Sequence, residues 1–297
     1  MVIGAISAPE AIVGVFAFAL GCAVGSFLNV IIYRLPRGLA INEPRRSFCP
    51  HCKAPIRGSD NIPLFSFLML AGRCRSCSAR ISWRYPMVEG LTGLLFLAVF
   101  VVERTSAAVG PGVAILMALL AALLVASSAI DIEYFIIPDE ISIFGLAGGL
   151  LAGLLLPELH VGEAPYHTFK ALTGLRHLDG LLGSVIGALG GGVLVLVFAL
   201  IGALIFRREA IGIGDAKLMA MVGAFFGWKV AFVAFFLAPF VGLVYGLPVL
   251  IMSGRHVMPY GPFLSTGTIV TVLFRPALCA GLQYYLDTAG RLLGLGG

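Results

Sequence analysis

Two aspartates lie at the edges of apolar segments, where they could form a catalytic pair. Asp131 follows one apolar run and opens the stretch DIEYFIIPD at residues 131–139. Asp215 lies within GIGDAK at residues 212–217, where a later apolar run begins. Two carboxylates about 3 Å apart cannot both ionise, so they share a proton. One can then activate a water molecule as a base while the other donates a hydrogen bond to a scissile carbonyl, as in an aspartic protease.

The acidic residues of these stretches also have purely structural interpretations. Asp139 follows Pro138 ahead of an apolar run, which is a position typical of a helix N-cap. Glu133 could be a solvated charge at a membrane interface, and Asp215 could cap its own helix or pair with Lys217. The glycines before Asp215 allow a backbone or an extended substrate to come close, but they could equally serve helix packing. Spacing alone leaves these alternatives open.

Four cysteines form two C-x-x-C pairs in the most polar part of the chain, Cys49 with Cys52 and Cys74 with Cys77. Twenty-one residues separate the pairs, one more than the usual linker of a zinc ribbon. Two residues between thiolates let both sulfurs reach one tetrahedral ion, and basic neighbours help to keep the thiols deprotonated. The pattern predicts a structural Zn²⁺ site whose four protein ligands leave no open position for chemistry. Two disulfides are the alternative.

The composition indicates that membrane helices position these residues. Hydrophobic residues make up 59% of the 297 residues and charged residues 12%, against about 25% charged in ordinary soluble domains. This leaves too little polar surface to cover a soluble globule, and it also excludes intrinsic disorder. The apolar runs are continuous rather than alternating, which favours helices over a β-barrel. We therefore predict an all-α polytopic membrane protein.

Eight apolar runs predict about eight transmembrane helices. They cover residues 11–33, 88–102, 113–130, 141–156, 181–206, 216–228, 230–252 and 263–285. The expected organisation has three parts: a first transmembrane helix at residues 1–33, a small zinc-ribbon-like cysteine domain at 34–86, and a transmembrane domain with both aspartates at 87–297.

The basic residues predict the orientation of the chain in the membrane. Ten of the twenty Lys and Arg residues fall within residues 34–86. Because short cytoplasmic loops carry an excess of positive charge, we expect this part in the cytoplasm and both termini outside. A reducing cytoplasm disfavours disulfides, which strengthens the zinc interpretation. Both aspartates are then expected at the cytoplasmic ends of their helices.

Further motifs occur in an ordered series along the chain. They are GSFLNV at residues 25–30, YRLP at 33–36, the two cysteine pairs, NIP at 61–63, ISWRYP at 81–86 with Glu89, the stretch at 131–139, GIGDAKL at 212–218 and PYGPF at 259–263. With these motifs in this order, the sequence strongly resembles the type IV prepilin peptidases, or prepilin leader peptidase/N-methyltransferases, over nearly its whole length. Two features depart from that family: residues 157–180 form a longer region than usual, and Tyr260 stands where phenylalanine is common.

The resemblance implies a bifunctional enzyme of the bacterial inner membrane with its active sites facing the cytoplasm. Such enzymes remove the short basic leader from type IV prepilins and type II secretion pseudopilins, then methylate the new N-terminal amine with S-adenosylmethionine. The resemblance maps the catalytic pair onto Asp131 and Asp215, and it favours Asp131 over Asp139. The implied partners are prepilin and pseudopilin substrates and membrane lipid, and no nucleic acid is expected.

No motif independently indicates methyl transfer. The chain lacks a strand followed by G-x-G-x-x-G that would suggest a Rossmann cofactor site. Glu89 and the region of Asn61 are weak candidates for the S-adenosylmethionine site, although Glu89 could instead be an interfacial charge at a helix start. An ion-coupled transporter that uses Asp131 and Asp215 as a relay is the main alternative function. A membrane scaffold with a partner-binding zinc domain is another, but it leaves the aspartate motifs unexplained.

Overall fold

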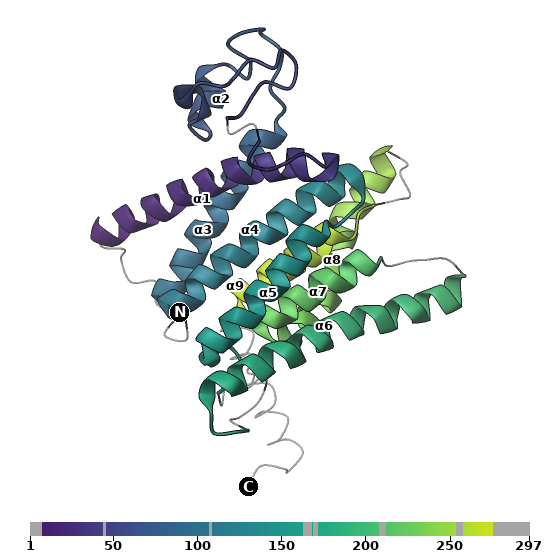
Figure 1. The fold of residues 1–297 in the computed structure, drawn as a ribbon. Coiled ribbons are helices and arrows are strands. Elements are labelled where there is room, and N and C mark those ends of the chain that lie inside the picture. Colours follow the sequence, from purple (N-terminus) through teal and green to yellow (C-terminus); the bar gives the residue numbers. More distant parts are fainter. Residues whose placement is uncertain are drawn as a thin grey trace.

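The chain forms a helical bundle with a small segment containing the four cysteines at one end (Figure 1). The computed structural model describes residues 8–43, 46–106, 109–162, 168, 172–207, 212–253 and 258–275. Within these residues, the regular structure consists of α-helices, short 3₁₀ helices and two isolated β-bridges. The predicted all-α fold is confirmed.

Nine α-helices follow one another along the described chain. They are α1 (Ala8–Arg34), α2 (Phe65–Met69), α3 (Arg84–Thr105), α4 (Pro111–Tyr134), α5 (Asp139–Leu155), α6 (Arg176–Phe206), α7 (Ile213–Phe226), α8 (Trp228–Ser253) and α9 (Gly261–Leu273). Three 3₁₀ helices occupy Leu35–Arg37, Gly58–Asn61 and Pro157–Leu159.

Each of the eight predicted apolar runs contains a helix, and α2 is an additional short helix near the cysteines. Helices α1, α3, α4 and α6 are long and apolar enough to cross a membrane. Helix α5 has 17 residues and α7 has 14, because α5 ends just before Pro157 and α7 ends at Gly227, whose φ is 85°. The last predicted run extends to residue 285, and its part beyond residue 275 lies outside the described residues.

Helix α7 occupies the centre of the bundle and is buried by α5, α6, α8 and α9. The side chains of Leu218, Met219, Met221, Phe225 and Phe226 are each at most 1% exposed. In a bilayer, such burial stabilises the bundle through van der Waals packing between helices and not through removal of apolar surface from water. The N-terminal end of α7, which carries Asp215, is thereby held in a fixed position.

The outer helices present apolar side chains to the surroundings. Phe16 on α1 is 67% exposed and Leu204 on α6 is 72% exposed. An extensive apolar surface of this kind suits lipid rather than water, in agreement with a polytopic membrane protein.

Helices α1 and α3 carry the part of the chain that we call the cysteine segment, residues 34–86. It begins at the last residue of α1 and ends in the first turn of α3, so it lies above that end of the bundle (Figure 1). The two helices approach closely at Gly25, where an added Cβ would lie 2.7 Å from the Cα of Glu89. This approach fixes Glu89 at the junction between the bundle and the cysteine segment.

Candidate functional site

Three helix ends meet around Asp131 and Asp215. Asp131 lies in the last turn of α4, which stops at Phe135, a residue in the left-handed conformation with φ 56°. Asp215 lies in the first turn of α7, just after Gly212. Helix α9 begins next to them at Gly261.

Both carboxylates are buried and held by backbone N–H groups. Asp131 is 6% exposed, and its Oδ2 accepts a hydrogen bond of 2.9 Å from the Gly261 N–H. Asp215 is 7% exposed, and its Oδ2 accepts one of 3.1 Å from the Gly212 N–H. The two carboxylates are close enough for their charges to interact. Neither forms an ion pair with a cation of the described chain.

Glycines and one isoleucine shape the space between the aspartates. A Cβ added at Gly214 would lie 3.2 Å from the Cβ of Ile137, and one added at Gly261 would lie 2.7 Å from Asp131 Oδ2. The half-buried side chain of Tyr260 lies close enough to Asp215 to interact with its charge. A glycine of α7 therefore packs against the connection between α4 and α5, and a glycine of α9 packs against the end of α4.

The other acidic residues of the stretch 131–139 are exposed. Asp139 is the first residue of α5, and its Oδ1 lies 2.6 Å from Lys217 Nζ. The N-cap prediction for Asp139 is wrong, because Pro138 occupies that position and Asp139 makes no capping bond. The same ion pair overturns the predicted alternative in which Lys217 pairs with Asp215. Asp215 does take part in capping its own helix, because its Oδ2 accepts a hydrogen bond from the N–H of Gly212, the N-cap of α7. This bond leaves the other carboxylate oxygen available.

The four cysteine sulfurs form one cluster. All four Sγ atoms lie within 4.8 Å of one another, and the Sγ atoms of Cys49 and Cys77 are 3.9 Å apart. Zn–S bonds of 2.3 Å in a tetrahedron place sulfurs about 3.8 Å apart, so the cluster fits one such ion. All four thiols are free, so the alternative of two disulfides is not what the structure contains.

The two cysteine pairs have the same local backbone structure. In the first loop, the Cys49 N–H donates to Ala54 O and the Lys53 N–H donates to Cys49 O, each at 2.9 Å. In the second loop, the N–H groups of Cys74 and Ser78 donate to Ala79 O and Cys74 O, also at 2.9 Å. Lys53 and Ser78 both have positive φ, 59° and 58°. The sulfurs therefore come from two equivalent turns.

The local donors also affect the thiols of the second loop. Backbone N–H groups of Cys77 and Ser76 lower the pKa of the Cys74 thiol to about 7. The Ala79 N–H lowers the pKa of Cys77, but partial desolvation and the neighbouring sulfurs together raise it to about 11. Proximity of the sulfurs thus opposes full deprotonation, and a bound cation would reverse that effect.

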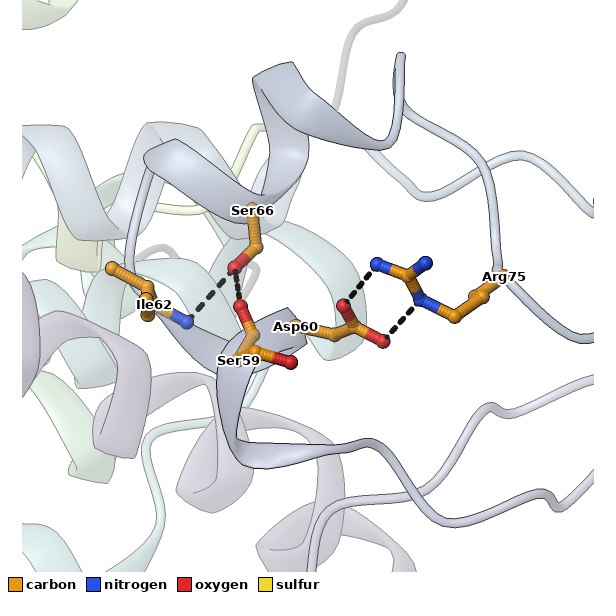
Figure 2. A network of polar contacts seen from close by, with 5 residues as sticks. All are labelled: Ser59, Asp60, Ile62, Ser66 and Arg75. Carbon is orange, nitrogen blue, oxygen red and sulfur yellow. Dashed lines mark hydrogen bonds and ion pairs between the residues drawn. The ribbon is translucent and has the colours of Figure 1, made fainter.

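A polar network ties the second cysteine loop to the chain between the pairs (Figure 2). Arg75 Nε and Nη2 donate to the two oxygens of Asp60 at 2.8 and 2.7 Å, and this guanidinium holds the pKa of Asp60 below its usual value. Ser66 Oγ accepts from the Ile62 N–H at 2.9 Å and donates to Ser59 O at 3.0 Å. These contacts connect the loop to the 3₁₀ helix and to α2.

Glu89 links the bundle to the cysteine segment. It is 8% exposed, and its Oε2 accepts a hydrogen bond of 2.8 Å from the Leu64 N–H. The alternative interpretation of Glu89 as an interfacial charge at a helix start is wrong, because Glu89 lies in the second turn of α3 and its side chain is buried. Glu89 lines a cavity of about 650 Å³ beneath the cysteine segment, and Asn61 lines it too.

Some site residues were not assigned a role from the sequence. Gly261 and Asn29 lie in motifs that carried the resemblance, but nothing in those motifs predicts their contacts. Gly261 lies 130 positions from Asp131, and Asn29 lies 56 positions from Tyr85, whose carbonyl accepts a 3.1 Å hydrogen bond from Asn29 Nδ2. The order of the motifs is a signal that could have identified these residues as site candidates.

Comparison with known proteins gives consistent matches over most of the chain. Residues 19–102 match the Bacterial Peptidase A24 N-terminal domain, and residues 117–247 match the Type IV leader peptidase family. A prepilin leader peptidase/N-methyltransferase of Aeromonas hydrophila is 35% identical over 88% of this chain and 89% of its own length. A type 4 prepilin-like proteins leader peptide-processing enzyme of Escherichia coli is 35% identical over 87% of this chain and 93% of its own.

A prepilin leader peptidase/N-methyltransferase of Myxococcus xanthus is 37% identical over 81% of this chain and 64% of its own length. No solved structure shows a significant match. The two matched domains together span the elements that carry the aspartates and the cysteines. The chain belongs to the type IV leader peptidase family.

Proposed function

We propose that this protein cleaves the basic leader from type IV prepilins and type II secretion pseudopilins at the cytoplasmic face of the bacterial inner membrane. It then methylates the new N-terminal amine with S-adenosylmethionine. The observation that carries the cleavage proposal is the pair of buried carboxylates, Asp131 and Asp215, held at one end of the bundle by backbone N–H groups. The names of the relatives support both activities.

In the proposed cleavage step, the pair holds one proton. Each carboxylate is fixed through Oδ2, which leaves its other oxygen to face water or substrate. The ionised member removes a proton from water, whose oxygen attacks the scissile carbonyl, while the protonated member donates to the carbonyl oxygen. The resulting diol then collapses: the C–N bond breaks, and a proton passes from the pair to the leaving amine.

The proposed orientation follows from charge. The cysteine segment holds half of the lysines and arginines, so we place it, together with the aspartate pair, on the cytoplasmic side. A basic leader ahead of an apolar helix would then present its cleavage site at the membrane face. Lipid is the expected neighbour of the outer helices.

We assign a structural zinc ion to the cysteine cluster. Purified protein should contain about one zinc per chain by elemental analysis. A Cys74→Ser variant should lose the metal and loosen the cysteine segment, measured as faster proteolysis there, because metal binding supplies folding energy to a small segment. Acidification should release the metal, since protons compete for the thiolates. A metal-free protein with oxidised Cys49 and Cys52 would contradict this assignment.

The close packing at Gly261 gives a second test of the cleavage site. Gly261→Ala should lower leader cleavage about tenfold or more, because the added Cβ would lie 2.7 Å from Asp131 Oδ2 and displace the carboxylate. Alanine is the better helix former by about 1 kcal/mol, so a lost helix cannot explain the defect. The matched control is Gly110→Ala, whose Cβ meets nothing within 4 Å. Equal cleavage by both variants would argue against Asp131 as a catalytic residue.

Cleavage without an ion gradient separates this proposal from the transporter alternative. Purified protein in detergent should convert a prepilin to its mature form, measured by mass spectrometry. A relay that couples transport to a gradient has no such activity. If folded, metal-loaded protein does not cleave the prepilin, the peptidase proposal is wrong.

A further inference from the structure

A large cavity separates the cysteine segment from the ends of α1, α3 and α4. Its volume is about 650 Å³, within the roughly 300–1,000 Å³ typical of small-molecule sites. Glu89 and Asn29 line it from the helices, and Phe48 lines it from the first cysteine loop. Leader cleavage by Asp131 and Asp215 makes no use of this space, since neither aspartate lines it.

Two residues that line the cavity, Asn29 and Arg84, each have one buried polar atom with no partner among the described residues. Asn29 is 3% exposed, and its Oδ1 makes no hydrogen bond. Its orientation is fixed, because Nδ2 donates to the Tyr85 carbonyl at 3.1 Å. Arg84 pairs with Glu133 through Nη1 at 2.6 Å, but its Nε is buried and unpaired. Unsatisfied buried groups are rare in folded proteins, so one acceptor and one donor here point to a ligand.

The chemistry of the wall selects the kind of ligand. Glu89 offers a buried carboxylate on the wall that Asn29 also lines, and Arg84 offers a cationic donor. The rings of Tyr33, Phe48 and Tyr85 also line the cavity, and such rings can stack against a nucleobase. A ligand with an amine, a carboxylate and a purine matches this wall: the amine suits the acceptors Glu89 and Asn29, the carboxylate suits Arg84, and the purine suits the rings.

A basic leader peptide fits this cavity less well. Among the described residues, six arginines line it: Arg34, Arg37, Arg57, Arg75, Arg80 and Arg84. Two of its three carboxylates are already paired, Asp60 with Arg75 and Glu133 with Arg84. The cavity would therefore repel a chain rich in lysine and arginine.

We propose that this cavity binds S-adenosylmethionine, with Asn29 Oδ1 accepting from its amine and Arg84 donating to its carboxylate. This inference rests on the proposed methylation. In the transfer, the neutral N-terminal amine of the product forms a C–N bond as the C–S bond breaks. The electron pair of the C–S bond stays on sulfur, which becomes a neutral thioether, and the methylated ammonium releases a proton to water.

The cavity also lies close to the place of cleavage along the chain. Glu133 lines the cavity and is two residues from Asp131 on α4, a rise of about 3 Å along the helix axis. The two side chains leave α4 about 200° apart around its axis, so the new amine would have to pass around the end of α4 to reach the cofactor.

The test measures cofactor binding by the full chain in detergent, with radiolabelled S-adenosylmethionine. Arg84→Gln and Asn29→Leu should each weaken binding about tenfold or more. Arg104→Gln is the control, because Arg104 also pairs with a glutamate, Glu10, but lies at the opposite end of α3, away from the cavity. It should bind as the wild type does. Leader cleavage by each preparation reports whether the variant is folded.

Ultraviolet cross-linking of the wild type gives a readout that needs no variant. The label should map to peptides containing residues 29–37, 46–57 or 84–89. If wild-type protein methylates its product but the label maps elsewhere, or both variants bind normally, the cavity assignment is overturned and the proposed function stands. If the wild type neither binds the cofactor nor methylates, both the methylation proposal and the assignment are wrong. Binding of a leader peptide in place of the cofactor would also overturn the assignment.

Discussion

Asp131→Asn and Asp215→Asn should each lower leader cleavage by about 10³-fold or more, to near the limit of detection. Asparagine has almost the same shape as aspartate, and its amide oxygen can still accept the hydrogen bond from Gly261 or Gly212. It cannot hold or release the shared proton, so the pair can no longer activate water. Mass spectrometry of a prepilin incubated with each purified variant measures the loss.

Asp139→Asn is the matched control for this prediction. Asp139 is on the same stretch of sequence, but its carboxylate is 55% exposed and paired with Lys217, which is 40% exposed. Exposed ion pairs of this kind contribute about 0–1 kcal/mol, so cleavage should stay within a few-fold of the wild-type rate. If Asp139→Asn is inactive and Asp131→Asn cleaves normally, the catalytic assignment within this stretch is wrong.

The helices could be predicted because continuous apolar runs have few other outcomes in a membrane. The ends of the shorter helices also follow from local chemistry, as at Pro157 after α5 and Gly227 after α7. The burial of α7 on every side could not be predicted. An apolar helix that faces lipid and one that faces other helices have nearly the same composition.

The cysteine cluster was the most predictable part of the site, because two C-x-x-C pairs define most of its geometry locally. The contact of Asp131 with Gly261 was not predictable, since it depends on how α4 and α9 pack. The prediction that Asp139 is an N-cap failed for a local reason: Pro138 already has the extended backbone of an N-cap, and Lys217 attracts the Asp139 carboxylate instead. The unpaired oxygen of Asn29 likewise appears only after the segment folds over it.

Cleavage and methylation should be separable by substitution. Asp215→Asn should fail to methylate a full prepilin, because the amine to be methylated does not exist before cleavage. The same variant should methylate a peptide that already begins with the mature phenylalanine at close to the wild-type rate, since methyl transfer needs no aspartate pair. Glu89→Gln should do the reverse, leaving cleavage intact and lowering methylation about tenfold or more.

Glu89→Gln should impair methylation and not cleavage because Glu89 lies at the junction between the helical bundle and the cysteine segment. Glutamine can still accept the hydrogen bond from Leu64, which keeps the cysteine segment attached to α3. Among the described residues of the cavity wall, which is rich in arginine, it removes the one carboxylate without an arginine partner, and this carboxylate is the group that would face the sulfonium of the cofactor and the amine of the product. Mass spectrometry of both products, with S-adenosylmethionine present, distinguishes the two losses. The pre-cleaved peptide needs no cleavage. If folded Asp215→Asn cannot methylate it, Asp215 is required for methyl transfer itself, and the two reactions share one site.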